Sequence, residues 1–227
     1  MKVMVLGASG LTGQMVMENL LSRTEVSSVV VPVRRPLALT HPKLVPQVID
    51  FDDMESWPGL FDVDVLVCCL GTTISKAGSR EAFRKVDYGY ALTAARLARA
   101  AGARGLILMS AVGASASSKV FYSRVKGELE EAVRALDFPY LSIYHPSLLL
   151  GERNEQRMAE SLGMAVMPLA NHVLIGPLRK YRAIHVSSVA SAMANEVIAL
   201  AGDMAAATGD QIRDYASILS LADAPRP

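Results

Sequence analysis

The sequence predicts an α/β fold, in which a doubly wound parallel sheet lies between layers of helices and carries a small C-terminal lobe. Short apolar runs alternate with longer segments of helical periodicity, as in repeated strand–helix–strand units. The run at 63–70 is almost wholly apolar, which is typical of a strand covered on both faces of a parallel sheet. A glycine-rich stretch joins the first strand to the first helix. These three observations together indicate parallel strand pairing.

The glycine-rich stretch, GASGLTG, follows the apolar strand at 3–6 and precedes an apolar-periodic helix. Gly7 permits the tight turn, Gly10 lets a pyrophosphate approach bare backbone, and Gly13 lets the helix pack closely on the strand. The N-terminus of the helix offers unpaired N–H groups and a positive dipole end. The position of these glycines therefore predicts a phosphate cradle, with a plain structural turn as the alternative.

The remaining segments continue the same alternation. The helix at 81–101 carries a stripe of alanines that permits close approach to a sheet, and Gly102 ends it. A polar loop at 75–80 precedes it, and Asp52 and Asp53 open a short helical turn. The expected strands are 3–6, 26–33, 44–49, 63–70, 104–109, 140–144 and 183–186, with further helices at 121–131, 153–170 and 187–201, a last strand and helix within 210–221, and a frayed tail at 222–227.

Length and charge limit the possible classes of protein. A chain of 227 residues forms one domain, which we divide into a core at 1–150 and a substrate-side C-terminal lobe at 151–227. The formal net charge is +1, so no nucleic-acid-binding surface is implied. No stretch approaches the ~18 continuous apolar residues of a membrane span, and the first apolar run is too short for a signal peptide.

The two cysteines, Cys68 and Cys69, are neighbours on a predicted strand. Adjacent cysteines seldom bridge comfortably, so we exclude a disulfide framework and favour buried apolar packing over a redox role. This cysteine usage fits a reducing cytosol, and we expect a cytoplasmic protein. The histidines lack carboxylates or cysteines at ligand spacing, so we expect no metal site; they are His41, His145, His172 and His185.

Two arginines, Arg34 and Arg35, end the second strand about twenty residues beyond Gly13, where an NAD site usually carries an acid. Arginine binds phosphate bidentately, and its planar guanidinium stacks on adenine. The pair therefore favours NADP over NAD, because only NADP carries a 2′-phosphate. Two solvated arginines opening a loop at Pro36 are the alternative.

A tyrosine and a lysine, Tyr122 and Lys126, lie one helical turn apart on one face of a predicted helix. An ammonium group beside a phenol lowers the phenol pKa from about 10 toward neutral pH, as a phenolic general acid or base requires. Ser110, twelve residues before Tyr122 at a strand end, is placed to hold a substrate oxygen. Tyr88 and Tyr90 are competing phenols, but neither has a lysine four residues on.

Eight motifs follow one another along the chain: GASGLTG, VVVPVRR, VIDF, CCLGTT, KVDYGYALTAARLARAAG, LILMSAVGA, YSRVK and YHPSLLLGER. Their order and spacing resemble the short-chain dehydrogenase/reductases. They look most like the atypical group that includes the Tat-interacting oxidoreductases and their bacterial relatives. The resemblance covers about residues 1–155 and weakens beyond.

The resemblance implies a Rossmann fold with residues 1–150 as its dinucleotide-binding core. Ser110, Tyr122 and Lys126 match the Ser-Tyr-Lys triad of the family. Tyr122 would exchange a proton with the substrate oxygen, and Ser110 would orient the carbonyl group. Lys126 would lower the pKa of Tyr122 and bind the nicotinamide ribose.

The same resemblance assigns the cofactor contacts. The pyrophosphate would contact Gly7, Ser9, Gly10, Leu11, Thr12 and Gly13, and the 2′-phosphate would contact Arg34 and Arg35. The adenine would lie against Asp50 and Phe51, and the adenosine would be flanked by Leu70 and Gly71. The nicotinamide side would contact Tyr122, Lys126, Pro146 and Ser147. One departure is His145, which stands where many relatives carry arginine. We give it no catalytic role.

The favoured function is an NADP(H)-dependent oxidoreductase that moves a hydride between nicotinamide and a carbonyl or alcohol, acting on a small molecule. An NADP(H)-binding sensor with little turnover is the alternative, because fold does not prove function. An epimerase or dehydratase would use the same residues but usually needs a larger C-terminal domain. A methionine-rich face of the helix at 153–170 either lines the substrate pocket or packs in the core.

Overall fold

The computed structural model describes residues 1–151, 174, 176–204 and 206–224. Its centre is a seven-stranded sheet with the strand order β3-β2-β1-β4-β5-β6-β9, and every pairing is parallel. The strands are β1 (Lys2–Leu6), β2 (Ser28–Val33), β3 (Leu44–Val48), β4 (Val65–Cys68), β5 (Gly105–Met109), β6 (Tyr140–Tyr144) and β9 (Gly209–Arg213). The doubly wound parallel sheet predicted from the sequence is confirmed.

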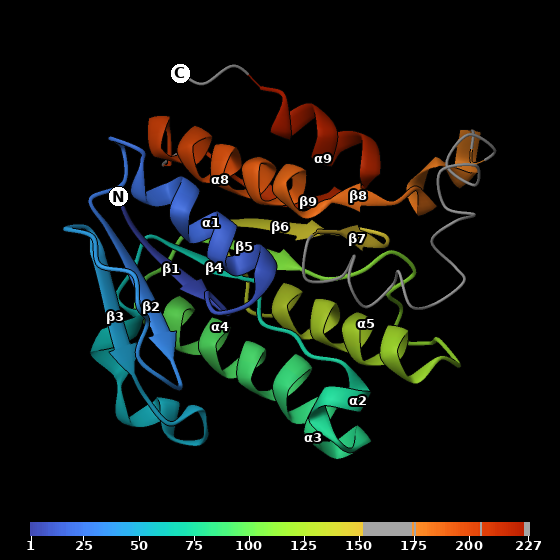
Figure 1. Cartoon of the computed structure of the whole chain (residues 1–227), viewed down its shortest axis with the longest axis horizontal. Coiled ribbons are helices and arrows are strands. Elements are labelled where there is room, and N and C mark those ends of the chain that lie inside the picture. Colours follow the sequence, from blue (N-terminus) through green and yellow to red (C-terminus); the bar gives the residue numbers. More distant parts are fainter. Residues whose placement is uncertain (152–173, 175, 205, 225–227) are drawn as a thin grey trace.

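Helices cover both faces of this sheet (Figure 1). Helices α1 (Leu11–Leu21), α8 (Val186–Gly202) and α9 (Tyr215–Ala222) lie on one face, and α4 (Ala91–Ala100) and α5 (Phe121–Arg134) on the other. Side chains of β1 alternate between the two resulting cores. Val3 and Val5 pack in the α1–α8 core, whereas Met4 and Leu6 pack in the α4–α5 core. Burial on both faces explains why the inner strands, such as β1 and β4, are almost wholly apolar.

The strand order changes direction between β1 and β4. From β1 the chain builds outward through β2 and β3, and it then returns to the other side of β1 with β4. Leu6 and Cys68 are paired at the carboxyl ends of these two strands. Parallel sheets of this kind bind ligands in the crevice at such a switch point. The topology therefore places a candidate site at the turns that follow β1 and β4.

The helix predicted at 81–101 is divided into three parts. These are α3 (Arg80–Arg84), a π-helical segment, η3 (Lys85–Tyr90), and α4. The wider turn contains Asp87, whose buried carboxylate contacts groups outside the helix. Residues 75–80 are also more regular than expected, because α2 (Ile74–Ala77) forms one turn there.

Several shorter elements complete the described chain. They are η1 (Phe51–Ser56), η2 (Pro58–Phe61), η4 (Gly176–Tyr181) and the paired strands β7 (Leu149–Leu150) and β8 (Ile184–His185). The helix predicted at 153–170 and His172 lie outside the described residues. Of the region assigned to the C-terminal lobe, α8 and β9 are parts of the main layers. Among the described residues, no helix has both the length and the apolar character of a membrane-spanning segment.

A buried carboxylate on α8 joins this helix to the sheet. Glu196 accepts hydrogen bonds from Tyr140 (2.7 Å), Tyr144 (2.7 Å) and Ser142 (3.0 Å) on β6, and from the Nε of Arg213 (2.8 Å) on β9. Burial and the Glu196 carboxylate together raise the pKa of Tyr140 to about 12. Because the charge is paired and surrounded by donors, this network stabilises the packing of α8 on β6 and β9.

Replacing Tyr140 with Phe should lower the free energy of unfolding at neutral pH by about 1–3 kcal/mol, because Glu196 loses a buried donor. The unfolded-state phenol ionises near pH 10, whereas the folded one ionises at about 12. In the wild type, the contribution of this phenol to the free energy of unfolding is therefore fully present below about pH 10. It is lost as the pH rises toward 12, by up to about 1.4 kcal/mol per pH unit. Urea unfolding across this range tests both effects. The control is Tyr181→Phe, because Tyr181 is exposed. If the free energy of unfolding fell with pH equally steeply in the wild type and in Tyr140→Phe, the raised pKa of Tyr140 would be contradicted.

Candidate active site

The glycine-rich turn after β1 is packed too closely to hold side chains at Gly7 and Gly13. Gly7 has φ +88°, and a Cβ atom there would lie 2.8 Å from the backbone of Cys69. A Cβ atom on Gly13 would lie 2.3 Å from the Gly7 carbonyl oxygen. That same oxygen accepts a hydrogen bond of 2.9 Å from the N–H of Gly10. The first turn of α1 is thus held against the end of β1, with its free N–H groups directed at the crevice.

Two adjacent cavities extend from this turn. One has a volume of about 400 Å³ and the other about 520 Å³, and both are lined by Ser9, Gly10, Cys69, Gly71, Thr72 and Lys76. The smaller cavity also includes the predicted site residues Leu11, Thr12, Ser110, Tyr122, Lys126, Pro146 and Ser147. The larger one also includes Gly7, Arg34, Phe51 and Leu70. Residues predicted for opposite ends of a dinucleotide therefore line two cavities that share a wall.

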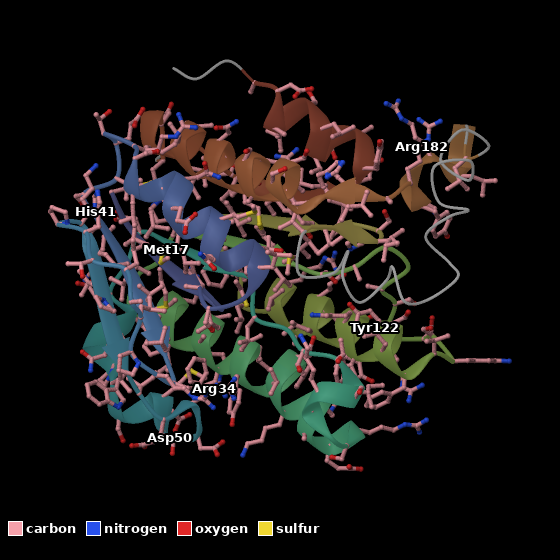
Figure 2. The ribbon with its side chains drawn as sticks, viewed as in Figure 1. Met17, Arg34, His41, Asp50, Tyr122 and Arg182 are labelled. Carbon is pink, nitrogen blue, oxygen red and sulfur yellow. The ribbon has the colours of Figure 1, made fainter. Side chains whose placement is uncertain are left out.

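Three predicted residues do not line either cavity. Gly13 lies beneath the turn, where it permits the close packing of α1. Asp50 is exposed, and its Oδ1 caps η1 by accepting a hydrogen bond of 2.9 Å from the N–H of Asp52. Arg35 is exposed beside Arg34 at the end of β2. In the view of Figure 2, Arg34 and Asp50 lie near one another, and Tyr122 lies further along the molecule.

Lys126 is buried and forms an ion pair with a residue that sequence reasoning missed. Its Nζ lies 2.8 Å from Oδ1 of Asp87, which is also buried. The other oxygen of Asp87 accepts a hydrogen bond of 2.8 Å from the N–H of Thr72, after β4. Asp87 lies four residues before Ala91, on the same helix face as the row of small residues of α4. An acid on an otherwise apolar helix face is unusual, and this was the signal in the sequence that could have identified Asp87.

The pKa of Tyr122 is raised, whereas the sequence predicted a lowered value. Burial is the main cause, and the Asp87 carboxylate adds to it, while the Lys126 ammonium acts in the opposite direction. For Lys126 itself, burial favours a lower pKa, but Asp87 and Tyr122 outweigh it and raise the pKa. The expectation was wrong because it considered the charge of Lys126 without the burial of the phenol, which is the larger effect, or the Asp87 carboxylate that faces Lys126.

Ser110 is buried at the end of β5, and its hydroxyl donates to Oε1 of Glu130. The same Glu130 oxygen lies 2.8 Å from Nε2 of His145, and its other oxygen lies 3.6 Å from Arg134. Sequence reasoning did not identify Glu130, and it assigned no role to His145. In this structure Ser110 lines the smaller cavity, but its proton is directed to Glu130.

The two cysteines are both buried, as expected of apolar packing. Burial raises the pKa of Cys68 to about 11 and also raises that of Cys69, so both thiols are protonated at neutral pH. Within residues 1–151, 174, 176–204 and 206–224, no group of three His, Cys, Asp or Glu side chains is placed to hold a metal ion.

The lining residues fit a nicotinamide dinucleotide. Glycine backbone lies at the junction of the cavities, where a pyrophosphate must approach the main chain closely. Arg34 lies at one end and lacks an acidic partner in the part of the chain that the structure describes. A phenol and an ammonium group lie at the other end. Phe51 and Tyr90, with ring centroids 5.5 Å apart, supply an aromatic wall for the adenine side.

Changing Gly13 to Ala should destabilise the fold by about 1–3 kcal/mol, because the added methyl group cannot fit beside the Gly7 carbonyl. The matched control is Gly59→Ala, since a Cβ atom at Gly59 meets nothing within 4 Å. We expect the control to stay within about 0.5 kcal/mol of wild type. Thermal and urea unfolding measure both variants. Equal stabilities of the two variants would show that the close contact is not required.

Comparison with known proteins agrees with this geometry. The NAD dependent epimerase/dehydratase family matches residues 3–225. Protein HTATIP2 of Rattus norvegicus is 39% identical over 164 residues, covering 70% of this chain and 67% of the relative. Protein FMP52-1, mitochondrial, of Scheffersomyces stipitis is 36% identical over 173 residues, covering 74% of this chain and 76% of the relative.

A similar fold occurs in the oxidoreductase ylbE of Lactococcus lactis, with a TM-score of 0.64 at 16% identity, covering 97% of this chain and 96% of that one. This likeness confirms the Rossmann fold that the motifs predicted. The family match extends over nearly the whole chain, and the two relatives support the resemblance to atypical members. The chain therefore belongs to the NAD dependent epimerase/dehydratase family, within the short-chain dehydrogenase/reductases whose motifs it carries.

Proposed function

We propose that the protein is an NADP(H)-dependent oxidoreductase that transfers a hydride between the nicotinamide ring and a small carbonyl or alcohol substrate. One observation carries the proposal. The two cavities share a wall at the glycine turn, with Arg34 at one end and the Tyr122–Lys126 pair at the other. This arrangement matches the chemistry of an extended dinucleotide whose reactive ring faces a proton donor.

The preference for NADP rests on charge at the adenosine end. Arg34 is exposed, lines the larger cavity and lacks an ion-pair partner among the described residues. No acid occupies the positions after β2 that would meet a ribose 2′-hydroxyl. Lys85 also lines this cavity, but it is paired with Asp52 at 2.7 Å. Arg34 is therefore the cation placed to bind a 2′-phosphate, and Arg35 lies beside it.

The chain supplies proton transfer and orientation, and a bound nicotinamide supplies the hydride. Because its pKa is raised, Tyr122 carries its proton at neutral pH. It is thus in the form that donates a proton to a substrate oxygen, as carbonyl reduction requires. Lys126 lies near this phenol and is held in place by Asp87. Ser110 orients the substrate once its hydroxyl turns from Glu130 toward the cavity.

The hydrogen bond from Ser110 to Glu130 also favours the second candidate, an NADP(H)-binding sensor with little turnover. A sensor has no need of a serine hydroxyl directed at a substrate. The family name also includes epimerases and dehydratases. Of the described residues beyond 174, however, α8, β9 and α9 cover or extend the main sheet and form no separate substrate domain.

The proposed partner is a small-molecule substrate, with neither nucleic acid nor membrane involved. A cytoplasmic location stays a prediction. Several of the relatives, FMP52-1 among them, carry mitochondrial names, and those names describe the relatives alone.

Changing Tyr122 to Phe should lower turnover by at least about a hundredfold while NADPH affinity stays within about threefold, because only the proton donor is lost. Tyr88→Phe is the matched control, since Tyr88 is a partly buried phenol stacked under Arg84 (4.5 Å) and lines neither cavity. Single-turnover oxidation of NADPH with a panel of aldehydes and ketones measures the effect. Full activity of Tyr122→Phe would place the chemistry elsewhere.

Changing Arg34 to Ala should weaken NADPH binding by about tenfold to a hundredfold, because a charge-assisted contact to the 2′-phosphate is lost. NADH affinity should change by less than about threefold. Arg35→Ala is the neighbouring comparison, and we expect a smaller loss there because Arg35 does not line the cavity. Fluorescence titration with each dinucleotide measures these affinities. Equal losses for NADPH and NADH would refute the NADP assignment.

A further inference from the structure

Lys76 lies at the junction of the two cavities, on a short and well-defined turn. It is one of the residues that line both of them, together with Ser9 and Gly10 of the glycine-rich turn. Helix α2, which carries Lys76, is capped by the Thr73 hydroxyl at 3.2 Å and closed by Gly78, whose N–H bonds to Ile74 at 2.9 Å. These local contacts fix the backbone that presents Lys76.

The charges around the cavities single out Lys76. Lys126 is neutralised by Asp87 at 2.8 Å, and Lys85 by Asp52 at 2.7 Å. Arg34 lies at the adenosine end of the larger cavity and does not line the smaller one. Among the described residues, Lys76 is therefore the cation at the junction without a carboxylate partner. An exposed lysine with its ammonium group free is able to pair with an incoming anion.

The glycine turn provides N–H donors at this junction but no formal charge. A dinucleotide pyrophosphate carries about two negative charges, and the N–H groups and dipole of α1 compensate them only in part. Helix α1 and helix α2 lie on the two sides of the sheet, in the layers of α8 and of α5 respectively (Figure 1). A phosphate group at the junction thus has backbone donors from one layer and a cation from the other.

We propose that Lys76 pairs with the pyrophosphate of the bound dinucleotide and is a binding residue of this site. The inference rests on the proposed function, since it requires that the cavities bind a nicotinamide dinucleotide. It differs from the role of Arg34, because the pyrophosphate is common to NADPH and NADH whereas the 2′-phosphate is not. Lys76 consequently adds affinity for both cofactors without discriminating between them.

The test compares Lys76→Gln, which removes the charge, with Lys76→Arg, which keeps it. Lys119→Gln is the matched control, because Lys119 is an exposed lysine that lines neither cavity. NADPH is titrated by its fluorescence, and NADH and ADP-ribose by displacement of NADPH. ADP-ribose carries the pyrophosphate without nicotinamide or a 2′-phosphate. Each titration is repeated at low and high salt, and thermal unfolding checks that the variants are folded.

We expect Lys76→Gln to weaken the binding of NADPH, NADH and ADP-ribose by the same factor of about ten, and the loss of affinity should be smaller at high salt. Lys76→Arg and Lys119→Gln should stay within about threefold of wild type. Unchanged affinities in Lys76→Gln, or a loss confined to NADPH, would overturn the pairing with pyrophosphate while leaving the proposed function intact. A wild-type protein that binds none of the three ligands would overturn both proposals.

Discussion

The backbone contact between Gly13 and Gly7 is the constraint on which the candidate site depends. Helix α1 can begin directly against the end of β1 only because both positions lack side chains, since a Cβ atom on Gly13 would lie 2.3 Å from the Gly7 oxygen. Gly7 in turn lies against the backbone after β4, where a Cβ atom would be 2.8 Å from Cys69. The crevice between β1 and β4 is therefore bounded by bare backbone at the point where the strand order changes direction.

Buried charges set the chemistry at the other end of the cavities. Asp87 holds Lys126 in place and neutralises it, and burial then leaves Tyr122 with a raised pKa. Removing one partner of such a buried pair costs about 3–5 kcal/mol, so the pair is also a constraint on folding. Glu130 has a similar role beside Ser110, where it connects the serine hydroxyl to His145. The Asp87 and Glu130 carboxylates both lie on helices, and each binds side chains from other parts of the fold.

Local patterns predicted the fold and part of the site. The apolar runs predicted the ends of β1 to β6 within two residues. Most of these strands are buried on both faces, which leaves a continuous hydrophobic signal in the sequence. The glycine turn and Arg34 were found from their positions relative to those strands. Asp87, Glu130 and Glu196 were not, since each has partners on other helices, strands or loops and pairing of that kind depends on tertiary structure. The raised pKa of Tyr122 was missed because the burial of the phenol also depends on tertiary structure.

Binding of a nicotinamide dinucleotide by the unmodified protein is the central claim, and a titration of the wild-type chain with NADPH and NADH tests it most directly. The enhancement and blue shift of nicotinamide fluorescence report entry of the reduced ring into the smaller cavity, beside Tyr122. Saturable binding of NADPH, with NADH weaker by at least about tenfold, is the expected result, in keeping with one additional charge-assisted contact. Failure of both dinucleotides to bind at millimolar concentration would contradict the assignment of these cavities to a cofactor.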